Sequence, residues 1–284
     1  MPLPIAAAED YARTVMSWAA VTLAEDVVAA RDVAYGEHRL HRYNVFAPRG
    51  AGGRPVLVFW HGGGWTNGYR DWVSFMAPHV TRLGFVLVAP SYRLAPEHSL
   101  PAAFEDSLSL LAHVESNVAC WGGDAARLYL AGHSAGGHLA ALAALRSADR
   151  LRAGGREGSV RGCMPISGIM DLHHPKPEPE SLEERVYTMV LADPTQDAAM
   201  SPLCWTAGNR VPFVLTCGEG DGERVIRSNT RMAALLRLQP APAALYVERG
   251  QDHFQTHTSL RDGAHPWYGR LSQLAKETTP RKRS

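Results

Sequence analysis

The residue best suited to chemistry in this sequence is Ser134, at the centre of the pentapeptide Gly-His-Ser-Ala-Gly at residues 132–136. A short apolar run, Leu128–Ala131, precedes the pentapeptide, and a stretch with helical spacing begins at Gly137. A serine between a strand and a helix occupies a sharp turn, which flanking glycines allow because they have no Cβ atom to clash. Such a turn exposes the hydroxyl at the carboxyl edge of a sheet. The pattern predicts that Ser134 is a nucleophile.

A run of three glycines could stabilise the negative charge that develops when a serine attacks a carbonyl group. Gly62, Gly63 and Gly64 follow the apolar run Val56–Trp60 after a single histidine. Glycines let backbone N–H groups approach a developing oxyanion without obstruction by side chains. Ala135, the residue after the expected nucleophile, would supply one further N–H group. We therefore expect an oxyanion hole made of these three glycines and Ala135.

A nucleophilic serine needs a base, and the base needs an acid that orients it. In this chain order the acid should follow the serine, and the histidine should come last. Asp221 and His253 each follow a short apolar run, so both are expected on loops at the carboxyl ends of strands. Glu219 is a rival acid in the same loop as Asp221, and His257 is a rival base one turn beyond His253. We assign Asp221 and His253 to the catalytic pair.

Two further residues are assigned to substrate binding. Trp65 directly follows the oxyanion glycines, so its ring is expected to form a wall of the pocket beside the scissile bond. His133 directly precedes Ser134 and is assigned to the same pocket. An aromatic wall favours a flat aryl group through stacking.

Short apolar runs bounded by glycine and proline alternate with stretches of helical spacing after residue 55. Such runs are typical of parallel strands buried on both faces, and their alternation with helices predicts right-handed crossovers. We therefore expect an α/β fold, with a mostly parallel central sheet and helices on both faces. The first thirty residues have helical spacing, and Asp32–Tyr35 with Arg42–Phe46 predict a hairpin at the sheet edge. The other expected strands are Val56–Trp60, Phe85–Ala89, Leu128–Ala131, Phe213–Thr216 and Ala244–Val247.

One long irregular stretch, Leu172–Arg210, interrupts this alternation, and its beginning at Pro175–Pro179 is rich in proline and glutamate. Long irregular stretches inside a compact domain tend to be lids or binding loops. We expect one domain over residues 1–284 that contains this segment as an inserted lid. Residues 278–284, which are rich in basic side chains, are expected to form a flexible tail.

The composition argues against several classes of partner. The 284 residues carry 29 basic and 28 acidic side chains, and this net charge of +1 offers no footprint for nucleic acid or for an anionic membrane. No window has the roughly 18 consecutive apolar residues of a membrane span. The early residues Glu9 and Asp10 have no basic segment before them, so no secretory signal is expected.

Thirteen histidines raise the question of a metal site. No His-Glu-x-x-His or Cys-x-x-Cys motif occurs, and the neighbours His173 and His174 alone are weak support for one. No phosphate-binding loop or dinucleotide fingerprint follows the first strands, so we expect neither a metal nor a cofactor. The cysteines show no paired spacing, which predicts buried free thiols, a reducing compartment and a cytoplasmic location. They are Cys120, Cys163, Cys204 and Cys217.

The sequence resembles the α/β-hydrolase superfamily, and in particular the branch shared by hormone-sensitive-lipase-like esterases and kynurenine formamidases. The run His61–Trp65 is similar to the His-Gly-Gly-x-Trp signature of the formamidases and to the His-Gly-Gly-Gly motif of the esterases. Residues 91–98 (Ser-Tyr-Arg-Leu-Ala-Pro-Glu-His) resemble an esterase stretch. Residues 132–139, 166–172 and 252–254 resemble formamidase motifs. Gly64 departs from the pattern of animal formamidases, and the segment 175–199 matches neither the formamidases nor the esterases.

This resemblance implies an α/β-hydrolase fold with Ser134 as nucleophile, Asp221 as acid and His253 as base. Our first hypothesis is hydrolysis of a small amide, most specifically an aryl formamide such as N-formylkynurenine. The second is a carboxylesterase for short acyl chains, and the third is a non-catalytic binding protein on the same fold, which would lack a member of the triad. A small-molecule ester or amide is the expected partner. A homodimer remains open, because nothing in the sequence decides the oligomeric state.

Overall fold

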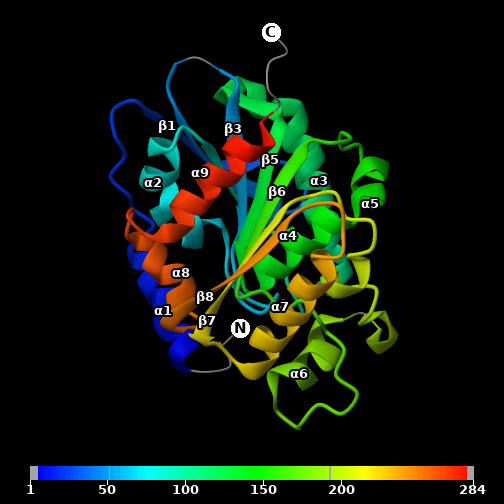
Figure 1. Ribbon diagram of the computed structural model, residues 1–284. Helices are drawn as coiled ribbons and strands as arrows, with labels where there is room; N and C mark the ends of the chain where they lie inside the picture. Colours follow the sequence, from blue (N-terminus) through cyan, green and yellow to red (C-terminus); the bar gives the residue numbers. More distant parts are fainter. Residues whose placement is uncertain (1–5, 51, 192, 280–284) are drawn as a thin grey trace.

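One eight-stranded sheet forms the centre of the computed structural model, which describes residues 6–50, 52–191 and 193–279. The strands lie in the order β1-β2-β4-β3-β5-β6-β7-β8 (Figure 1). β1 pairs antiparallel with β2, and β2 pairs antiparallel with β4, whereas all the following neighbours are parallel. The strands are β1 Val27–Ala34, β2 Arg42–Pro48, β3 Arg54–Trp60, β4 Val86–Pro90, β5 Gly123–His133, β6 Val160–Ile166, β7 Phe213–Gly220 and β8 Ala243–Asp252.

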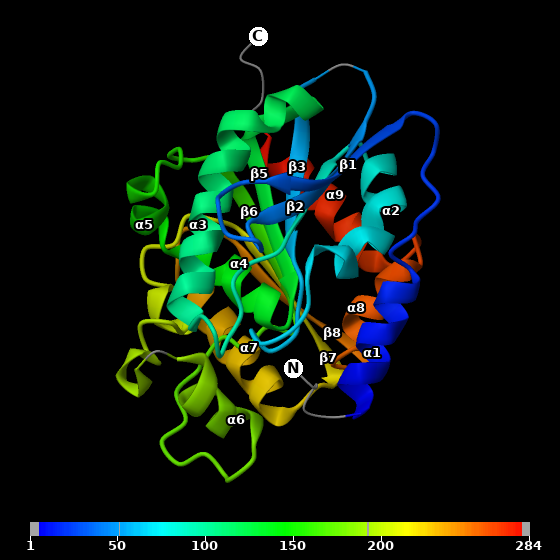
Figure 2. The same cartoon turned by 180° about the vertical axis from the view of Figure 1, so that it is seen from behind.

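Helices cover both faces of this sheet. One face packs against α3, α4 and α7, and the other packs against α1, α2 and α9. Figures 1 and 2 show these two layers from opposite sides, with α1 and α8 side by side although they come from opposite ends of the chain. The helices are α1 Ala6–Ser17, α2 Ala77–Arg82, α3 Leu100–Asn117, α4 Ala135–Leu145, α5 Ser147–Arg152, α6 Leu182–Arg185, α7 Glu223–Leu236, α8 Gln255–Thr258 and α9 Pro266–Thr278.

Strand β3 explains why the apolar runs are continuous rather than alternating. Its residues Val56, Val58 and Trp60 belong to the core on one face of the sheet. Leu57 and Phe59 belong to the core on the other face, and all five side chains are fully buried. A strand with helices on both faces must be apolar at every position. The predicted fold class, an α/β fold with a mostly parallel sheet and helices on both faces, is therefore confirmed.

The N-terminal region differs from the prediction of helical spacing over thirty residues. The helix α1 ends at Ser17, so Trp18 and Leu23 lie beyond it, and β1 already begins at Val27. The expected hairpin is present, with Val33 opposite Tyr43 in the antiparallel pair of β1 and β2. The helical periodicity misled because apolar residues that lie in a loop and on an edge strand happened to continue it.

Strand β6 lies between β5 and β7 but was absent from the predicted strands. Its sequence contains Gly162 and Pro165, two residues that are depleted in strands. A Cβ atom on Gly162 would lie 2.5 Å from Leu274 Cδ2, so the glycine lets α9 pack closely on the sheet. The local strand signal is weak here because packing against a helix determines the residue type.

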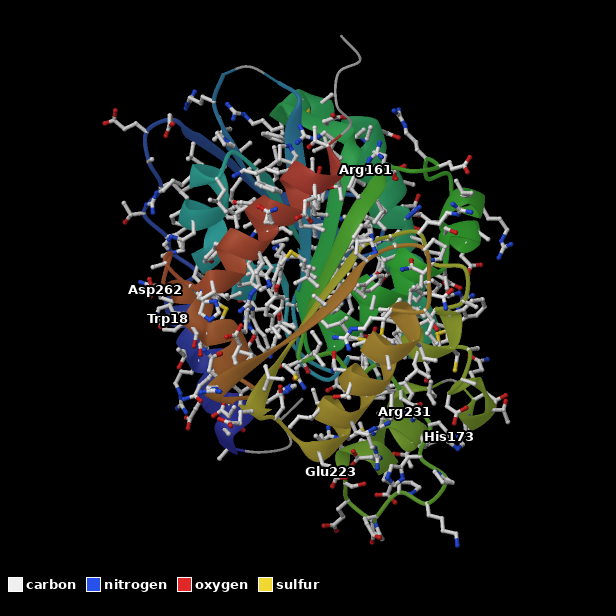
Figure 3. The ribbon with its side chains drawn as sticks, in the orientation of Figure 1. Trp18, Arg161, His173, Glu223, Arg231 and Asp262 are labelled. Atoms are coloured by element: carbon white, nitrogen blue, oxygen red, sulfur yellow. The ribbon has the colours of Figure 1, made fainter. Side chains whose placement is uncertain are left out.

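The segment 172–210 carries α6 and several single helical turns, including a π-helical turn at Val186–Val190. Ion pairs connect this segment, and Asp171 just before it, to α7: Arg224 lies 3.1 Å from Glu183, and Arg231 lies 2.6 Å from Asp171. Figure 3 shows Arg231 on α7 beside the stretch that carries His173. These contacts hold the segment against the start and middle of α7.

The predicted flexible tail at 278–284 begins too early. Thr278 is the last residue of α9, and its Oγ1 lies 2.8 Å from the hydroxyl of Tyr129. Thr279 accepts a hydrogen bond from Arg127. The rest of the predicted tail, residues 280–284, lies outside the described residues.

The prediction that all four cysteines are buried free thiols is half right. All four are free, but only Cys163 and Cys217 are buried, whereas Cys120 and Cys204 are exposed. Both exposed cysteines lie on short helical turns at the surface, outside the sheet. Separately, no helix in the described part of the chain is both long and apolar enough to cross a membrane.

Candidate active site

Ser134 lies in the sharp turn between β5 and α4, and its backbone has φ +54° and ψ −119°. The flanking glycines are required by close packing of the backbone. A Cβ atom on Gly132 would lie 2.4 Å from the carbonyl carbon of Gly136, and one on Gly136 would lie 2.2 Å from the carbonyl oxygen of Trp60. Real Cβ atoms do not approach backbone atoms so closely, so both positions need glycine.

The structure brings Ser134, His253 and Asp221 into one hydrogen-bonded series. His253 Nε2 lies 2.9 Å from Ser134 Oγ, and His253 Nδ1 lies 2.6 Å from Asp221 Oδ1. Asp221 directly follows β7, and His253 directly follows β8, its parallel neighbour. Because parallel strands end at the same edge of a sheet, residues 32 positions apart in the sequence meet there. This arrangement can transfer a proton from the serine to the histidine.

The Asp221 carboxylate is held by groups other than His253. Its Oδ2 accepts hydrogen bonds from Ser167 Oγ at 2.6 Å and from the Gly218 N–H at 2.7 Å. Burial acts to raise the pKa of Asp221, but the hydrogen bonds from its three donors outweigh burial and hold this pKa below its usual value. Asp221 is therefore a carboxylate at neutral pH, fixed in the orientation that His253 needs.

Ser167 is a site residue that the sequence analysis missed. It directly follows β6, just as Ser134, Asp221 and His253 follow or lie near the ends of their strands. Its backbone φ is +47°, and its N–H donates to the carbonyl of Thr216. Recognition of β6 would have supplied the signal, because Ser167 would then have stood at the carboxyl edge of the predicted sheet.

The rival acid and base lie elsewhere. Glu219 is exposed, and its Oε2 accepts a hydrogen bond from the Gly250 N–H at 2.9 Å. His257 is fully buried, and its Nδ1 lies 2.8 Å from the hydroxyl of Tyr11. The structure records no hydrogen bond between Glu219 and His253, nor between His257 and Ser134.

The three expected oxyanion glycines form a tight turn beside the serine. A Cβ atom on Gly62 would lie 3.3 Å from the Cβ of Ser134. Gly63 and Gly64 have φ +117° and +60°, values that favour glycine. Among the described residues, no acceptor receives the backbone N–H of any of the three glycines. These N–H groups and that of Ala135, the first residue of α4, are thus available to an oxyanion near Ser134.

A cavity of about 270 Å³ opens at Ser134. Trp65 lines it as expected, and so does His133, although His133 Nε2 is engaged with the carbonyl of His253 at 2.8 Å. The segment 172–210 contributes one side of the wall, and α1 contributes another that was not predicted. The lining residues from these two segments are Leu182, Glu183, Arg185, Val186 and Val190, together with Ala8 and Tyr11.

One group of side chains in the described ranges has the spacing of a metal site: His38, Glu97 and His98. None of the three lines the cavity at Ser134. His173 and His174 do not line it either, and His173 Nδ1 instead lies 2.7 Å from Asp197. The candidate metal group and these two histidines therefore lie apart from the lining of the cavity at Ser134.

Comparison with solved structures shows the same fold. A thermophilic carboxylesterase cloned from a metagenomic library, EstE1, superposes with a TM-score of 0.78 at 22% sequence identity, over 98% of this chain and 99% of that chain. An esterase from Pyrobaculum calidifontis gives a TM-score of 0.77 at 23% identity, over 95% of this chain and 91% of that chain.

Comparison with curated proteins gives relatives with esterase names. Esterase LipQ of Mycobacterium tuberculosis is 31% identical over 208 residues, which are 70% of this chain and 49% of LipQ. A probable isoprenylcysteine alpha-carbonyl methylesterase of Oryza sativa, ICMEL1, is 35% identical over 119 residues, which are 42% of this chain and 28% of that protein. The chain thus spans about half or less of the length of these relatives. A family model described as alpha/beta hydrolase fold matches residues 57–255, more than half of the chain. The chain belongs to the α/β-hydrolase family.

Proposed function

We propose that this protein is a serine hydrolase that cleaves small carboxylic esters with short acyl chains. The observation that carries the proposal is the series Ser134–His253–Asp221, with distances of 2.9 and 2.6 Å, at the mouth of an apolar cavity. A series complete in all three members also argues against a non-catalytic binding protein. The esterase names of LipQ and EstE1 favour an ester over an amide.

The geometry supports the following reaction. His253 Nε2 accepts the proton of Ser134 Oγ as the oxygen attacks the ester carbonyl. Asp221 keeps the other ring nitrogen protonated and stabilises the imidazolium that forms. The negative charge on the carbonyl oxygen is stabilised by N–H groups of the glycine turn, Gly62, Gly63 and Gly64, and of Ala135. His253 then donates its proton to the leaving alcohol. In the second half of the reaction, His253 takes a proton from water as the water oxygen attacks the acyl carbonyl, and it returns this proton to Ser134 Oγ as the carboxylic acid leaves.

A second candidate, hydrolysis of aryl formamides, is favoured by the aromatic lining of the cavity. Trp65, Trp72, Tyr11 and Phe254 all line it, so a flat aryl leaving group could stack there. A formyl group is the smallest acyl group and fits a cavity that α6 borders. Amide cleavage additionally requires His253 to protonate the departing nitrogen, which is a poorer leaving group than an alkoxide or phenolate.

A panel of four substrates separates these candidates: p-nitrophenyl acetate, p-nitrophenyl octanoate, formanilide and N-formylkynurenine. We expect kcat/KM to be highest for the acetate ester and to fall steeply for the octanoate. Efficient cleavage of the two formamides would make the formamidase the better description. The Ser134→Ala variant serves as the control, and we expect its activity to fall by about 10⁵–10⁶. Full activity of Ser134→Ala, or no turnover of any substrate by the wild type, would overturn the proposal.

The cytoplasmic location remains a prediction, and the oligomeric state remains open. Size-exclusion chromatography with light scattering on the purified chain measures the oligomeric state directly.

A further inference from the structure

Three buried side chains beside the catalytic histidine take no part in the reaction as described above. Tyr11 comes from α1, His133 from the end of β5, and His257 from α8. Their exposed fractions are 5%, 1% and 0%. The rings of His133 and His257 are stacked, with centroids 5.1 Å apart, and the ring of His133 lies 5.0 Å from that of His253.

The proton positions on His133 follow from its partners. His133 Nε2 lies 2.8 Å from the carbonyl oxygen of His253, and a carbonyl can only accept, so Nε2 carries a proton. Burial first, and then the neighbouring His253 and His257, lower the pKa of His133 well below its usual value. His133 is therefore neutral, and its unprotonated Nδ1 carries a lone pair that can accept a hydrogen bond from a donor. Among the described residues, the hydrogen-bonding group within reach of Nδ1 is the hydroxyl of Tyr11, at 3.4 Å.

The Tyr11 hydroxyl has two histidine neighbours and one proton. It lies 2.8 Å from His257 Nδ1 as well as 3.4 Å from His133 Nδ1, and burial raises its pKa, so it keeps its proton. If the Tyr11 hydroxyl donated its proton to His257 Nδ1, His257 would carry its own proton on Nε2, and that buried N–H would have no acceptor. His133 Nδ1 would then also lack a donor. If His257 Nδ1–H donates to Tyr11 and Tyr11 donates to His133, only an acceptor on His257 stays unpaired. The second arrangement leaves fewer buried polar groups unsatisfied, so it is favoured.

We propose that Tyr11 and His133 are positioning residues for the catalytic base. In this series of hydrogen bonds, His257 Nδ1–H donates to the Tyr11 hydroxyl, the Tyr11 O–H donates to His133 Nδ1, and His133 Nε2–H donates to the His253 carbonyl. This inference rests on the proposed function. His133 precedes Ser134 in the chain, and its Nδ1 lies 2.9 Å from where a Cβ of Gly62 would be. One imidazole thus contacts the turns that carry the nucleophile, the oxyanion donors and the base.

The consequence is that α1 forms part of the catalytic apparatus. His253 must reach Ser134 and Asp221 at once, and small errors in such geometry cost large factors in rate. Tyr11 transmits the position of α1 to the backbone of His253 through His133. His133, which the sequence analysis assigned to substrate binding, has both ring nitrogens used by protein groups, so this proposal gives it a positioning role instead.

The test compares Tyr11→Phe with a matched control, Tyr268→Phe. Both changes remove one buried hydroxyl and keep the ring; the hydroxyl of Tyr268 donates to the carbonyl of Leu260 at 2.7 Å, away from the cavity. For p-nitrophenyl acetate, Tyr11→Phe should lower kcat about tenfold and leave KM within about twofold, as expected for a misplaced base rather than a changed pocket. The rate of phosphonylation by a fluorophosphonate probe should fall equally. Tyr268→Phe should show wild-type kinetics, with a melting temperature lowered as much as that of Tyr11→Phe.

A pair of variants at His133 provides the second measurement. His133→Gln keeps one donor and one acceptor, whereas His133→Leu removes both, so the glutamine variant should retain the higher kcat. Wild-type phosphonylation by both Tyr11→Phe and His133→Leu would overturn the inference and leave the proposed function intact. A wild-type protein that does not react with the probe would overturn the proposed function, and this inference with it.

Discussion

Ser134 adopts a backbone conformation that few residues other than glycine adopt. Strain of this kind costs about 1–3 kcal/mol and persists only where the surroundings determine it. Here the Ser134 N–H donates to the carbonyl of Ile166 at 2.8 Å, and its carbonyl accepts from the His138 N–H at 3.0 Å. Hydrogen bonds to β6 and α4 thus hold the hydroxyl toward His253, and the two neighbouring glycines leave room for the turn.

The choice between the two acids at the carboxyl end of β7, Glu219 and Asp221, can be tested by a pair of isosteric variants. Asp221→Asn should lower kcat by about 10⁴, because an amide in place of the carboxylate leaves the imidazole of His253 in the wrong tautomer. Glu219→Gln should leave kcat near the wild-type value, because Glu219 only accepts a hydrogen bond from the Gly250 N–H and glutamine can do the same. Steady-state measurement of kcat on p-nitrophenyl acetate for the two variants decides which residue is the catalytic acid. A greater loss in Glu219→Gln than in Asp221→Asn would reverse the assignment.

Helix α6 borders the cavity, and an ion pair connects it to α7. Leu182 and Val186 line the cavity, and Glu183 pairs with Arg224 at 3.1 Å. Burial acts to raise the pKa of Glu183, but its hydrogen bonds and the charge of Arg224 hold the pKa below its usual value, so Glu183 is ionised. The ion pair joins α6 to the first turn of α7, which begins two residues after Asp221.

Removal of this ion pair should change acyl-chain preference. We expect a long acyl chain to displace α6, whose residues line the cavity, and Glu183→Gln weakens an interaction worth about 1 kcal/mol. We expect the ratio of kcat/KM for p-nitrophenyl octanoate over acetate to rise roughly fivefold. Glu223→Gln is the control: Glu223, labelled in Figure 3, is exposed at the start of α7 and lies 3.8 Å from Arg227. A ratio that is unchanged in Glu183→Gln, or that rises equally in Glu223→Gln, would show that α6 does not limit chain length.

The molecule as a whole contains several histidines that are buried without a charge partner. Burial lowers the pKa of His61 and His138 to about 4 and that of His257 to about 3, and it lowers the pKa of His133 as well. In the unfolded chain a histidine has a pKa of about 6.5. Between about pH 4 and pH 6.5 the unfolded state therefore binds more protons than the folded state, and the free energy of unfolding rises with pH over this window.

The expected result is acid sensitivity well above the range in which carboxylates titrate. At about pH 5.5 each of these histidines should reduce the free energy of unfolding by roughly 1 kcal/mol relative to neutral pH. Calorimetric melting temperatures should therefore fall steadily from pH 7 to pH 5. Asp221 acts in a lower window, because its depressed pKa makes its contribution disappear only as the pH falls below about 4. A constant melting temperature between pH 5 and pH 7 would contradict the account of the buried histidines.

Short-range patterns in the sequence were sufficient for the fold class and for the nucleophile. The turn at Ser134 and the glycine run at 62–64 reflect local backbone requirements. The consecutive apolar residues of β3 indicate that this strand is buried on both faces. Chain order then pointed to Asp221 and His253, although Glu219 and His257 stood close enough in the sequence to compete. Patterns of this kind report where strands end and which backbone conformations are needed.

The contacts between distant segments were decided by packing. Ser167 could not be found because β6 was hidden by Gly162, whose type reflects the approach of α9. Tyr11 could not be placed because its partners, His133 and His257, lie 122 and 246 positions away. Which side chains meet across such separations depends on strand order and on the docking of helices, and no local pattern contains that information. Tertiary packing also selects Asp221 over Glu219. Both lie at the carboxyl end of β7, but only Asp221 contacts His253, which directly follows β8.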